Sequence, residues 1–194
     1  MRVFLTTDRL ILRRFDESDV ENLVELDSDP EVMRYLTGGR PTQRETVRDE
    51  LLPWLLAKYE QPGGYAQWAA QERATGDFLG WFALTRNDPA APPDEAELGY
   101  RLRRVAWGKG YATEGSRAII RTAFTELGTR RIWAQTMAVN TASRRVMERS
   151  GLRFVRLFHL TWDYPIDGTE HGEVEYELLR DEWAARRDSP NSSI

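Results

Sequence analysis

The sequence predicts an α/β domain of the mixed α+β kind, in which helices pack on a central mixed sheet of about seven strands. Two apolar runs, at 65–71 and 78–84, flank the turn residues 75–77, and this spacing predicts an antiparallel hairpin. From 97 to 179, patterns typical of strands and of helices alternate, so further strands should join the same sheet. The length of 194 residues fits one such domain.

One strand and two helices are predicted before the hairpin. Residues 9–15 place apolar side chains between charged ones, as a strand does. The Ser-Asp-Val-Glu run at 18–21 fits a capping box, whose hydroxyl and carboxylate bond free backbone N–H groups reciprocally. The helix it opens should end at the Asp-Pro pair 29–30. A second box at 42–45 opens a helix that Pro53 is expected to kink.

The later elements follow from the same patterns. Strands are predicted at 97–102, 131–139, 154–162 and 174–179, and helices at 110–127 and 141–150. Asn140 and Gly151 are typical caps for the second of these helices. We take 1–186 as a single domain and 187–194 as a polar, frayed tail. Four tryptophans in apolar elements are expected in the core: Trp54, Trp68, Trp81 and Trp133.

Charge and composition exclude several classes of protein. With 31 acidic against 27 basic residues, the net charge of -4 gives no general attraction to nucleic acid or to anionic membranes. No stretch approaches the roughly 20 apolar residues that a membrane span needs. The absence of cysteine removes disulfides and thiolate nucleophiles, so a cytoplasmic protein is expected. His159 and His171 alone make a poor metal site, and no metal is expected.

The segment 107–112, Trp-Gly-Lys-Gly-Tyr-Ala, carries the clearest chemical signal. It joins a predicted strand to a long predicted helix, and its two glycines let the backbone turn tightly and approach a ligand. The first turn of a helix offers unpaired N–H groups and the positive end of its dipole, which suit a phosphate. The same pattern also occurs in ordinary tight turns. Neither a Walker loop nor a dinucleotide fingerprint is present.

Five segments together resemble the GNAT superfamily of acetyltransferases, and most of all the branch that contains the ribosomal-protein alanine N-acetyltransferases. They lie at 7–13, 97–102, 107–114, 140–143 and 148–152. The resemblance implies a sheet that splays between its fourth and fifth strands to admit acetyl-coenzyme A. In the superfamily pattern Gln/Arg-x-x-Gly-x-Gly/Ala, Trp107 takes the first place, which leaves the phosphate contacts mainly to backbone N–H groups.

The resemblance also assigns the coenzyme contacts. Backbone groups around Leu102 and Arg103 are expected to bond the pantetheine arm and polarise the thioester carbonyl, and Asn140 matches the asparagine that contacts this arm. The full expected coenzyme set is Leu102, Arg103, Arg104, Trp107, Gly108, Lys109, Gly110, Tyr111, Ala112, Thr113, Asn140 and Ser143.

With no cysteine nucleophile, direct attack of an amine on the thioester is the economical route, and it needs a neutral amine. Glu97 is the candidate base, directly or through a water; the alternative is a strand-end glutamate in a surface ion pair. Ser143 is the candidate acid for the departing thiolate, or else a helix-start serine that bonds backbone. Many relatives use a tyrosine where this chain has Met147, so Ser143 or Tyr100 must replace it.

The acceptor is expected to be a primary amine, either a protein N-terminus or a small molecule. Its expected contacts are Met33, Tyr35, Glu97, His159 and Trp162. The alternative function is a non-catalytic regulator that binds acyl-coenzyme A. No nucleic-acid or membrane partner is expected, and the oligomeric state is monomer or homodimer.

Overall fold

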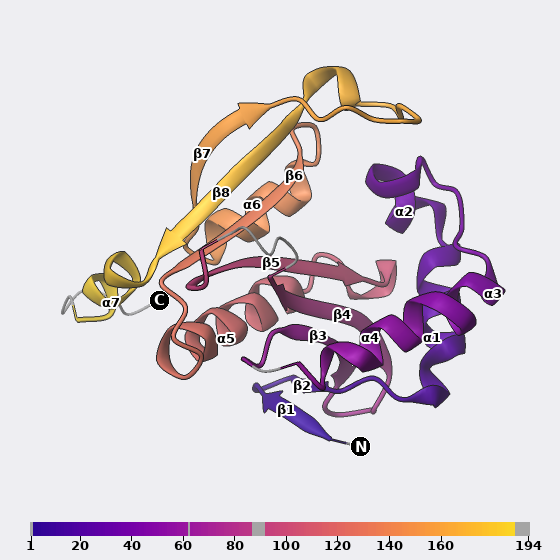
Figure 1. Cartoon of the computed structure of the whole chain (residues 1–194), viewed down its shortest axis with the longest axis horizontal. Coiled ribbons are helices and arrows are strands. Elements are labelled where there is room, and N and C mark those ends of the chain that lie inside the picture. Colours follow the sequence, from indigo (N-terminus) through magenta and orange to yellow (C-terminus); the bar gives the residue numbers. More distant parts are fainter. Residues whose placement is uncertain (1, 62, 87–91, 189–194) are drawn as a thin grey trace.

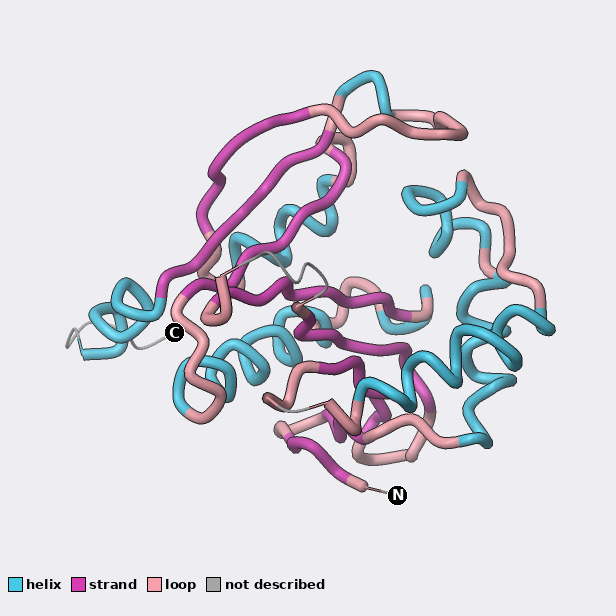
Figure 2. Tube along the Cα trace, viewed as in Figure 1, coloured by secondary structure: helices cyan, strands magenta, loops and turns pink. Residues whose placement is uncertain are grey.

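The computed structural model describes residues 2–61, 63–86 and 92–188, and these form one eight-stranded sheet covered by helices on both faces (Figures 1 and 2). The strand order is β1-β2-β3-β4-β5-β6-β8-β7, and every neighbouring pair is antiparallel except β5 and β6. The strands are β1 Val3–Thr6, β2 Leu10–Arg13, β3 Ala66–Glu72, β4 Phe78–Thr85, β5 Glu95–Leu102, β6 Arg131–Met137, β7 Arg153–Phe158 and β8 Glu173–Leu179.

The predicted fold class is confirmed. Strand β1 raises the strand number to eight, because the segment before residue 9 pairs with β2. The helical elements are η1 Glu17–Asp19, α1 Val20–Ser28, α2 Pro30–Thr37, α3 Arg44–Thr46, η2 Val47–Leu51, α4 Leu52–Lys58, η3 Arg104–Ala106, α5 Tyr111–Thr125, α6 Thr141–Arg149, η4 Thr169–His171 and α7 Arg180–Asp188. Among the described residues, no helix combines the length and apolar character that a bilayer crossing requires.

Two apolar clusters hold the layers together. The larger one packs side chains of the central strands, such as Phe82 and Ile132, against Ile119 and its neighbours on α5. The smaller one packs α1 and α4 onto the opposite face through residues such as Leu23 and Leu55. Because apolar burial is the main favourable term in folding, each face of the sheet is fixed by its own set of helices.

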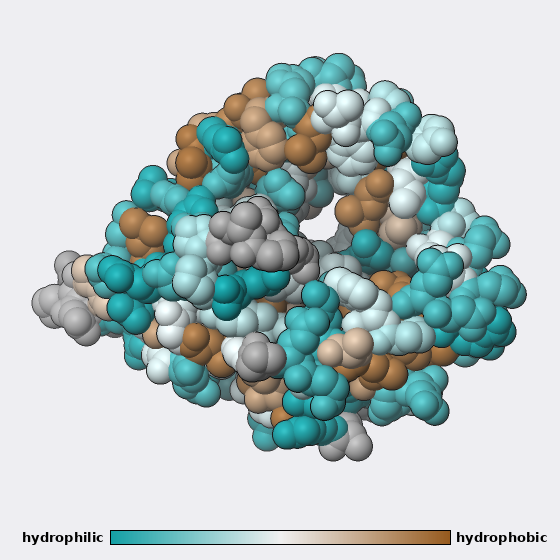
Figure 3. All heavy atoms as spheres, viewed as in Figure 1, coloured by the Kyte–Doolittle hydropathy of each residue, from teal (hydrophilic) through white to brown (hydrophobic). Residues whose placement is uncertain are grey.

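The sheet opens between β5 and β6. These strands pair only over three positions, from Glu95 with Arg131 to Glu97 with Trp133. Beyond that point β5 stays paired with β4 as far as Leu102, while β6 stays paired with β8 as far as Met137. The two halves of the sheet therefore diverge as the arms of a V. This is the splay expected between the fourth and fifth predicted strands, which are β5 and β6 once β1 is counted. Figure 3 shows an opening through the molecule at this place.

Both predicted capping boxes are wrong. At the first helix the cap is Asp16, whose carboxylate accepts from the N–H of Ser18, while Asp19 returns the bond to the backbone of Asp16. A short 3-10 turn thus precedes α1 and moves the cap two residues upstream. At the second, Thr42 donates its hydroxyl to Asp27 at 2.8 Å, and α3 begins without a side-chain cap.

Pro53 does not break its helix. A π-helical turn, Val47–Leu51, lies directly before it, and the N–H of Leu52 bonds the carbonyl of Val47. Pro53 then occupies the first turn of α4, where its missing N–H removes no helical hydrogen bond. The single irregular turn absorbs the proline without a sharp bend.

Helix α7 overlaps the start of the predicted tail. Helix α7 runs through residues 187 and 188, whereas residues 189–194 lie outside the described part of the chain. Trp183 of α7 packs against Phe124 with ring centroids 5.4 Å apart, which ties α7 to α5. The domain boundary at residue 186 remains a prediction. Of the four tryptophans expected in the core, Trp68 is buried, whereas Trp54 is 42% exposed.

Candidate active site

The N-terminus of α5 presents free backbone donors. Gly110 caps the helix at φ +85° with no side-chain cap, and the first intrahelical bond runs from Glu114 N–H to the Gly110 carbonyl. The preceding amides of the first turn, residues 111–113, therefore have no helical acceptor. At Gly108, φ is +72° and a Cβ would meet nothing within 4 Å, so the loop is open to a ligand. This arrangement suits a diphosphate.

Arg9, from the turn between β1 and β2, clamps this loop. Its guanidinium donates to the Lys109 carbonyl at 2.9 Å and to the Glu114 carboxylate at 2.7 Å, and it lies over the Tyr111 ring, 4.5 Å from the centroid. Burial raises the pKa of Glu114, but hydrogen bonds from Thr7 and Arg9 outweigh it and hold that pKa below its usual value. The glycine loop is thus held from one side by an ion pair.

The basic residues expected around the phosphates are arranged differently. Arg103 pairs with Glu25 of α1, and Arg104 lies 3.3 Å from the carboxylate of Asp29. Among the described residues, Lys109 has no such acidic partner and is the cation of the predicted set that is left to meet an anion. The guanidinium groups of Arg103 and Arg104 therefore bind the α1–α2 segment instead.

The open edge of β5 carries backbone groups that face the V. The N–H of Arg103 bonds the carbonyl of Leu79 at 2.8 Å, so it belongs to the β4 side. Because backbone groups alternate along a strand, those of Tyr100 and Leu102 face the opening. The Leu102 carbonyl accepts from the indole N–H of Trp107 at 2.8 Å. Trp107 therefore holds the loop against the end of β5. The N–H groups of Tyr100 and Leu102 remain available to a ligand.

Glu97 stands where the two arms separate. It is the last residue of β5 that pairs with β6, and its carboxylate has no hydrogen bond or ion pair with any described residue. Burial raises the pKa of Glu97 above the usual value. A half-buried carboxylate without a partner among the described residues is unusual, since burial of an unpaired charge costs free energy. Such a group is suited to accept a proton.

Two hydroxyl groups meet on the other face of β5. The hydroxyls of Tyr100 and Ser143 lie 3.0 Å apart, and that of Tyr100 also donates to the Ser143 carbonyl at 3.1 Å. Burial raises the pKa of Tyr100 to about 12, against the opposing effect of the Ser143 hydrogen bond. Asn140 caps α6 by accepting from the Ser143 N–H at 3.2 Å, which fixes this serine. Met147 is buried in the larger core cluster.

The expected acceptor residues border the opening from two sides. Met33 and Tyr35 belong to α2, with Met33 buried and Tyr35 half-buried. Trp162 belongs to the loop after β7, and its indole N–H donates to Glu173 at 2.8 Å. His159 is exposed beside Gly172 in the same loop. The loop reaches α2 where Ile166 lies against Gly38, so the two sides meet at the rim (Figure 1).

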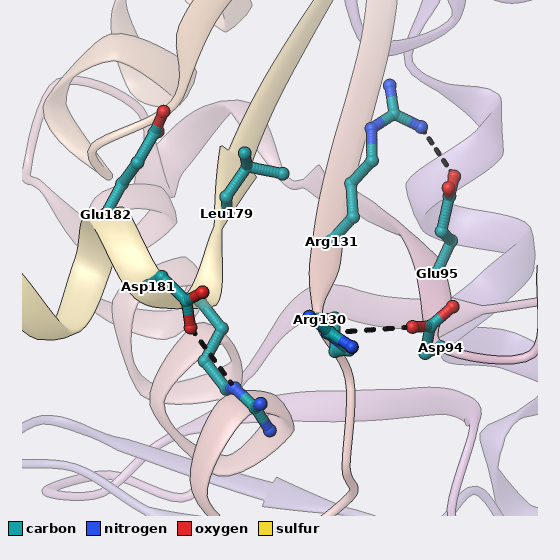
Figure 4. Close-up of a pocket in the computed structure, with 8 residues that line it drawn as sticks. Asp94, Glu95, Arg130, Arg131, Leu179, Asp181 and Glu182 are labelled. Carbon is teal, nitrogen blue, oxygen red and sulfur yellow. Dashed lines mark hydrogen bonds and ion pairs between the residues drawn. The ribbon is translucent and has the colours of Figure 1, made fainter.

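A separate depression of about 270 Å³ lies at the closed end of the V, where β5 and β6 begin and β8 ends (Figure 4). Its charged side chains are paired with one another, as in the 2.6 Å bond between Arg131 and Glu95. Within the described residues, no three or more His, Cys, Asp or Glu side chains are grouped as a metal site. We therefore take the V, and not this depression, as the candidate active site.

The sequence predicted Glu97, Tyr100, Ser143 and the glycine loop as site residues, and the structure places each of them around the V. It missed Arg9 and Glu114 as a pair. Their segments carried a visible signal, since both lie in runs that resemble the GNAT superfamily, but 105 positions separate them. No local sequence pattern predicts a contact between two residues that lie so far apart in the chain.

The chain is similar to known acetyltransferases. The family model described as "Acetyltransferase (GNAT) domain" matches residues 9–153. The "FsC-acetyl coenzyme A-N(2)-transacetylase" of Aspergillus fumigatus is 38% identical over 185 residues, which are 92% of this chain and 77% of that protein.

Solved structures show the same fold. A GNAT-family acetyltransferase from Bacillus anthracis superposes with a TM-score of 0.72 at 25% identity, over 94% of this chain and 100% of that one. RimL, described as a ribosomal L7/L12 alpha-N-protein acetyltransferase in complex with coenzyme A, has a TM-score of 0.77 at 18% identity, over 93% and 99% of the two chains.

Proposed function

This chain belongs to the GNAT acetyltransferase family, and from that premise we propose that it moves an acetyl group from acetyl-coenzyme A to a primary amine with Glu97 as the base. The observation that carries this assignment is the half-buried Glu97 carboxylate at the fork of β5 and β6, which has no partner among the described residues.

The residues around the V fit the coenzyme. The uncapped first turn of α5 and the open glycines before it suit the diphosphate, with Lys109 as the nearby cation. The outward-facing N–H groups of Tyr100 and Leu102 suit the amide oxygens of an extended arm along the open edge of β5. Donors aimed at a thioester oxygen would stabilise the charge that develops on it.

The proposed reaction moves two protons, one on each face of β5. Glu97 accepts a proton from the amine, whose nitrogen then forms a bond to the thioester carbon. The carbon–sulfur bond breaks, and the departing thiolate takes a proton from the hydroxyl pair of Ser143 and Tyr100. The two groups suit these roles because Glu97 lies on one face of the strand and Tyr100 on the other.

A small-molecule amine is favoured over a protein N-terminus. The Aspergillus relative, at 38% identity, has a name that specifies an N(2) nitrogen, and numbering one atom in this way is usual for a small substrate.

The test measures coenzyme binding by calorimetry and thiol release from acetyl-coenzyme A with a panel of amines. Glu97→Gln is expected to lower kcat/KM by about 100-fold or more, the usual scale of a lost general base, while coenzyme affinity is unchanged. Glu126→Gln, an exposed glutamate after α5, is the matched control and should leave kcat/KM unchanged.

The pH profile adds a second readout. Glu97 acts as a base only when ionised, so kcat/KM should rise with pH through a pKa above the usual 4.5, and Glu97→Gln should lose this limb. Coenzyme binding without thiol release on any amine, or full activity in Glu97→Gln, would overturn the proposal.

A further inference from the structure

Small residues lie beside Glu97 on one face of β5 and β4. Side chains alternate along a strand, so Glu97, Gly99 and Arg101 share one face. The antiparallel register places their partners on β4 beside them: Thr85, Ala83 and Trp81 in that order. Gly99 and Ala83 therefore form a floor between a carboxylate at one end and a guanidinium at the other.

Gly99 is not required by the backbone or by packing. Its φ lies outside the left-handed region that favours glycine. A Cβ at this position would lie 3.5 Å from the Cβ of Ala83 and 3.7 Å from the ring of Trp81, both ordinary contacts. The protein itself thus has room for a side chain here. Glycine at this position therefore leaves room for at least a methyl group beside the strand.

Arg101 keeps donors that the protein does not use. Its Nη1 donates to Asp27 at 2.5 Å, and its guanidinium lies over the Trp81 ring at 5.1 Å. Among the described residues, its Nε, which is buried, has no hydrogen-bond partner, and its Nη2 makes no hydrogen bond. The side chain is 19% exposed, so part of the guanidinium can be reached from outside. A planar group with five donors and one described bond has capacity for an acceptor oxygen.

We propose that Glu97, Gly99 and Arg101 form the acceptor slot, and that it selects a primary amine whose chain also carries a hydrogen-bond-accepting oxygen several bonds away. The amine lies at Glu97 and the oxygen at Arg101, with the intervening chain over Gly99. This inference rests on the proposed acetyl transfer. The Cα atoms of Glu97 and Arg101 lie about 13 Å apart at the usual strand rise. A free α-amino acid, whose nitrogen and oxygens sit on neighbouring carbons, is too short to reach both.

Charge refines the class of acceptor. Asp27 is 2% exposed and already neutralises Arg101, so the pair as a whole carries no net charge. A neutral carbonyl oxygen of an amide or ester can accept from Nη2 without burying a further charge. A second ammonium group at this end would face a guanidinium without an acceptor. The slot therefore favours an amide or ester over a polyamine.

Four acceptors with the same amine and chain length separate these cases: hexylamine, ε-aminocaproamide, ε-aminocaproate and hexamethylenediamine. With the wild-type chain, kcat/KM for the amide is expected to exceed that for hexylamine by about tenfold, the scale of one hydrogen bond to a charged donor. The diamine is expected at or below hexylamine. The carboxylate should fall between the amide and hexylamine.

Two variants test the two halves of the slot. Arg101→Met combined with Asp27→Asn removes the pair without leaving a buried charge, and it should lower kcat/KM for the amide to the value that the same variant shows with hexylamine. Gly99→Ala should raise KM for the amide and leave the coenzyme dissociation constant unchanged. Arg44→Met removes an exposed pair with Glu21 and is the matched control.

The outcomes are distinguishable. Turnover of all four acceptors with equal kcat/KM, or an equal loss on all four in the Arg101 variant, overturns the slot and leaves the acetyl transfer intact. Failure of every amine despite coenzyme binding overturns the transfer and the slot together. A preserved melting temperature in Gly99→Ala establishes that a change of KM comes from the slot.

Discussion

At the scale of single residues, two carboxylates show opposite solutions to burial. Asp19 is 0% exposed and lies against Arg13 in a two-pronged pair at 2.6 and 2.7 Å. Burial raises its pKa, but hydrogen bonds from Arg13, Asp16 and Asn22 outweigh that effect and lower it below the usual 3.8. Glu97 has no such partners, and burial raises its pKa. The first carboxylate stabilises the fold through its partners, whereas the second is the proposed base.

Arg13→Met should destabilise the chain strongly. It leaves Asp19 as an unpaired buried charge, which costs about 3–5 kcal/mol in the free energy of unfolding. Urea unfolding measures this value. Arg44→Met, which removes an exposed pair, is the control, with an expected loss below about 1 kcal/mol. Equal losses in the two variants would contradict the role of burial.

Glu97→Gln should stabilise the chain near neutral pH. The folded pKa of Glu97 is raised, so the folded state binds this proton more tightly than the unfolded chain does. Wild-type stability therefore falls as pH rises from the usual 4.5 through the folded pKa. Melting temperatures should be equal at pH below 4.5 and higher for Glu97→Gln above that window. A lower melting temperature at pH 7 would show that the carboxylate has a stabilising partner.

At the scale of elements, Gly110 has two roles at the start of α5. Gly110 sits at φ +85°, a conformation that costs other residues about 1–2 kcal/mol, and it also keeps side chains away from the free amides. The cap leaves these amides open because glycine has no side chain to bond them.

Gly110→Glu should abolish measurable coenzyme binding, because its carboxylate would add negative charge beside the free amides. It should also lower stability through its backbone conformation. Gly128→Glu is the matched control, since Gly128 has φ +74°, open space around it and lies beyond the other end of α5. Calorimetry should show binding in Gly128→Glu only. Normal affinity in a folded Gly110→Glu variant would contradict the phosphate assignment.

At the scale of the whole molecule, long-range ion pairs connect the edges of the V. Arg9 ties the β1–β2 turn to the glycine loop, and Arg101 and Arg103 tie the end of β5 to α1. These pairs hold the loop and the α1–α2 segment against the same strand. The geometry of the site therefore depends on contacts between segments that no single element contains.

Arg9→Met should raise KM for acetyl-coenzyme A by about tenfold with little change of kcat, because it loosens the loop without touching Glu97 or the hydroxyl pair. Initial rates at varied coenzyme concentration separate the two constants. Arg121→Met, from the exposed side of α5, is the control. A loss confined to kcat would place Arg9 in the chemical step instead.

Prediction from sequence succeeded where the signal was local. The 78–84 run and its turn predicted the hairpin, and Asn140 was identified as the cap of α6. It failed where local signals compete, as at Ser18, where Asp16 stands two residues away and takes the cap. It also failed for Trp54, because an apolar element does not say which of its sides meets the core.

The sequence by itself determined the order of the elements, the glycine turn before α5 and the chemical types on β5, because these depend on neighbours within a few residues. Only the tertiary structure decided which distant groups meet: Arg9 with Glu114, Tyr100 with Ser143, and Arg101 with Asp27. It also decided that the Glu97 carboxylate meets no such partner within the described part of the chain. The physical reason is that burial and pairing are properties of the closed sheet and its helices, which no stretch of chain possesses alone.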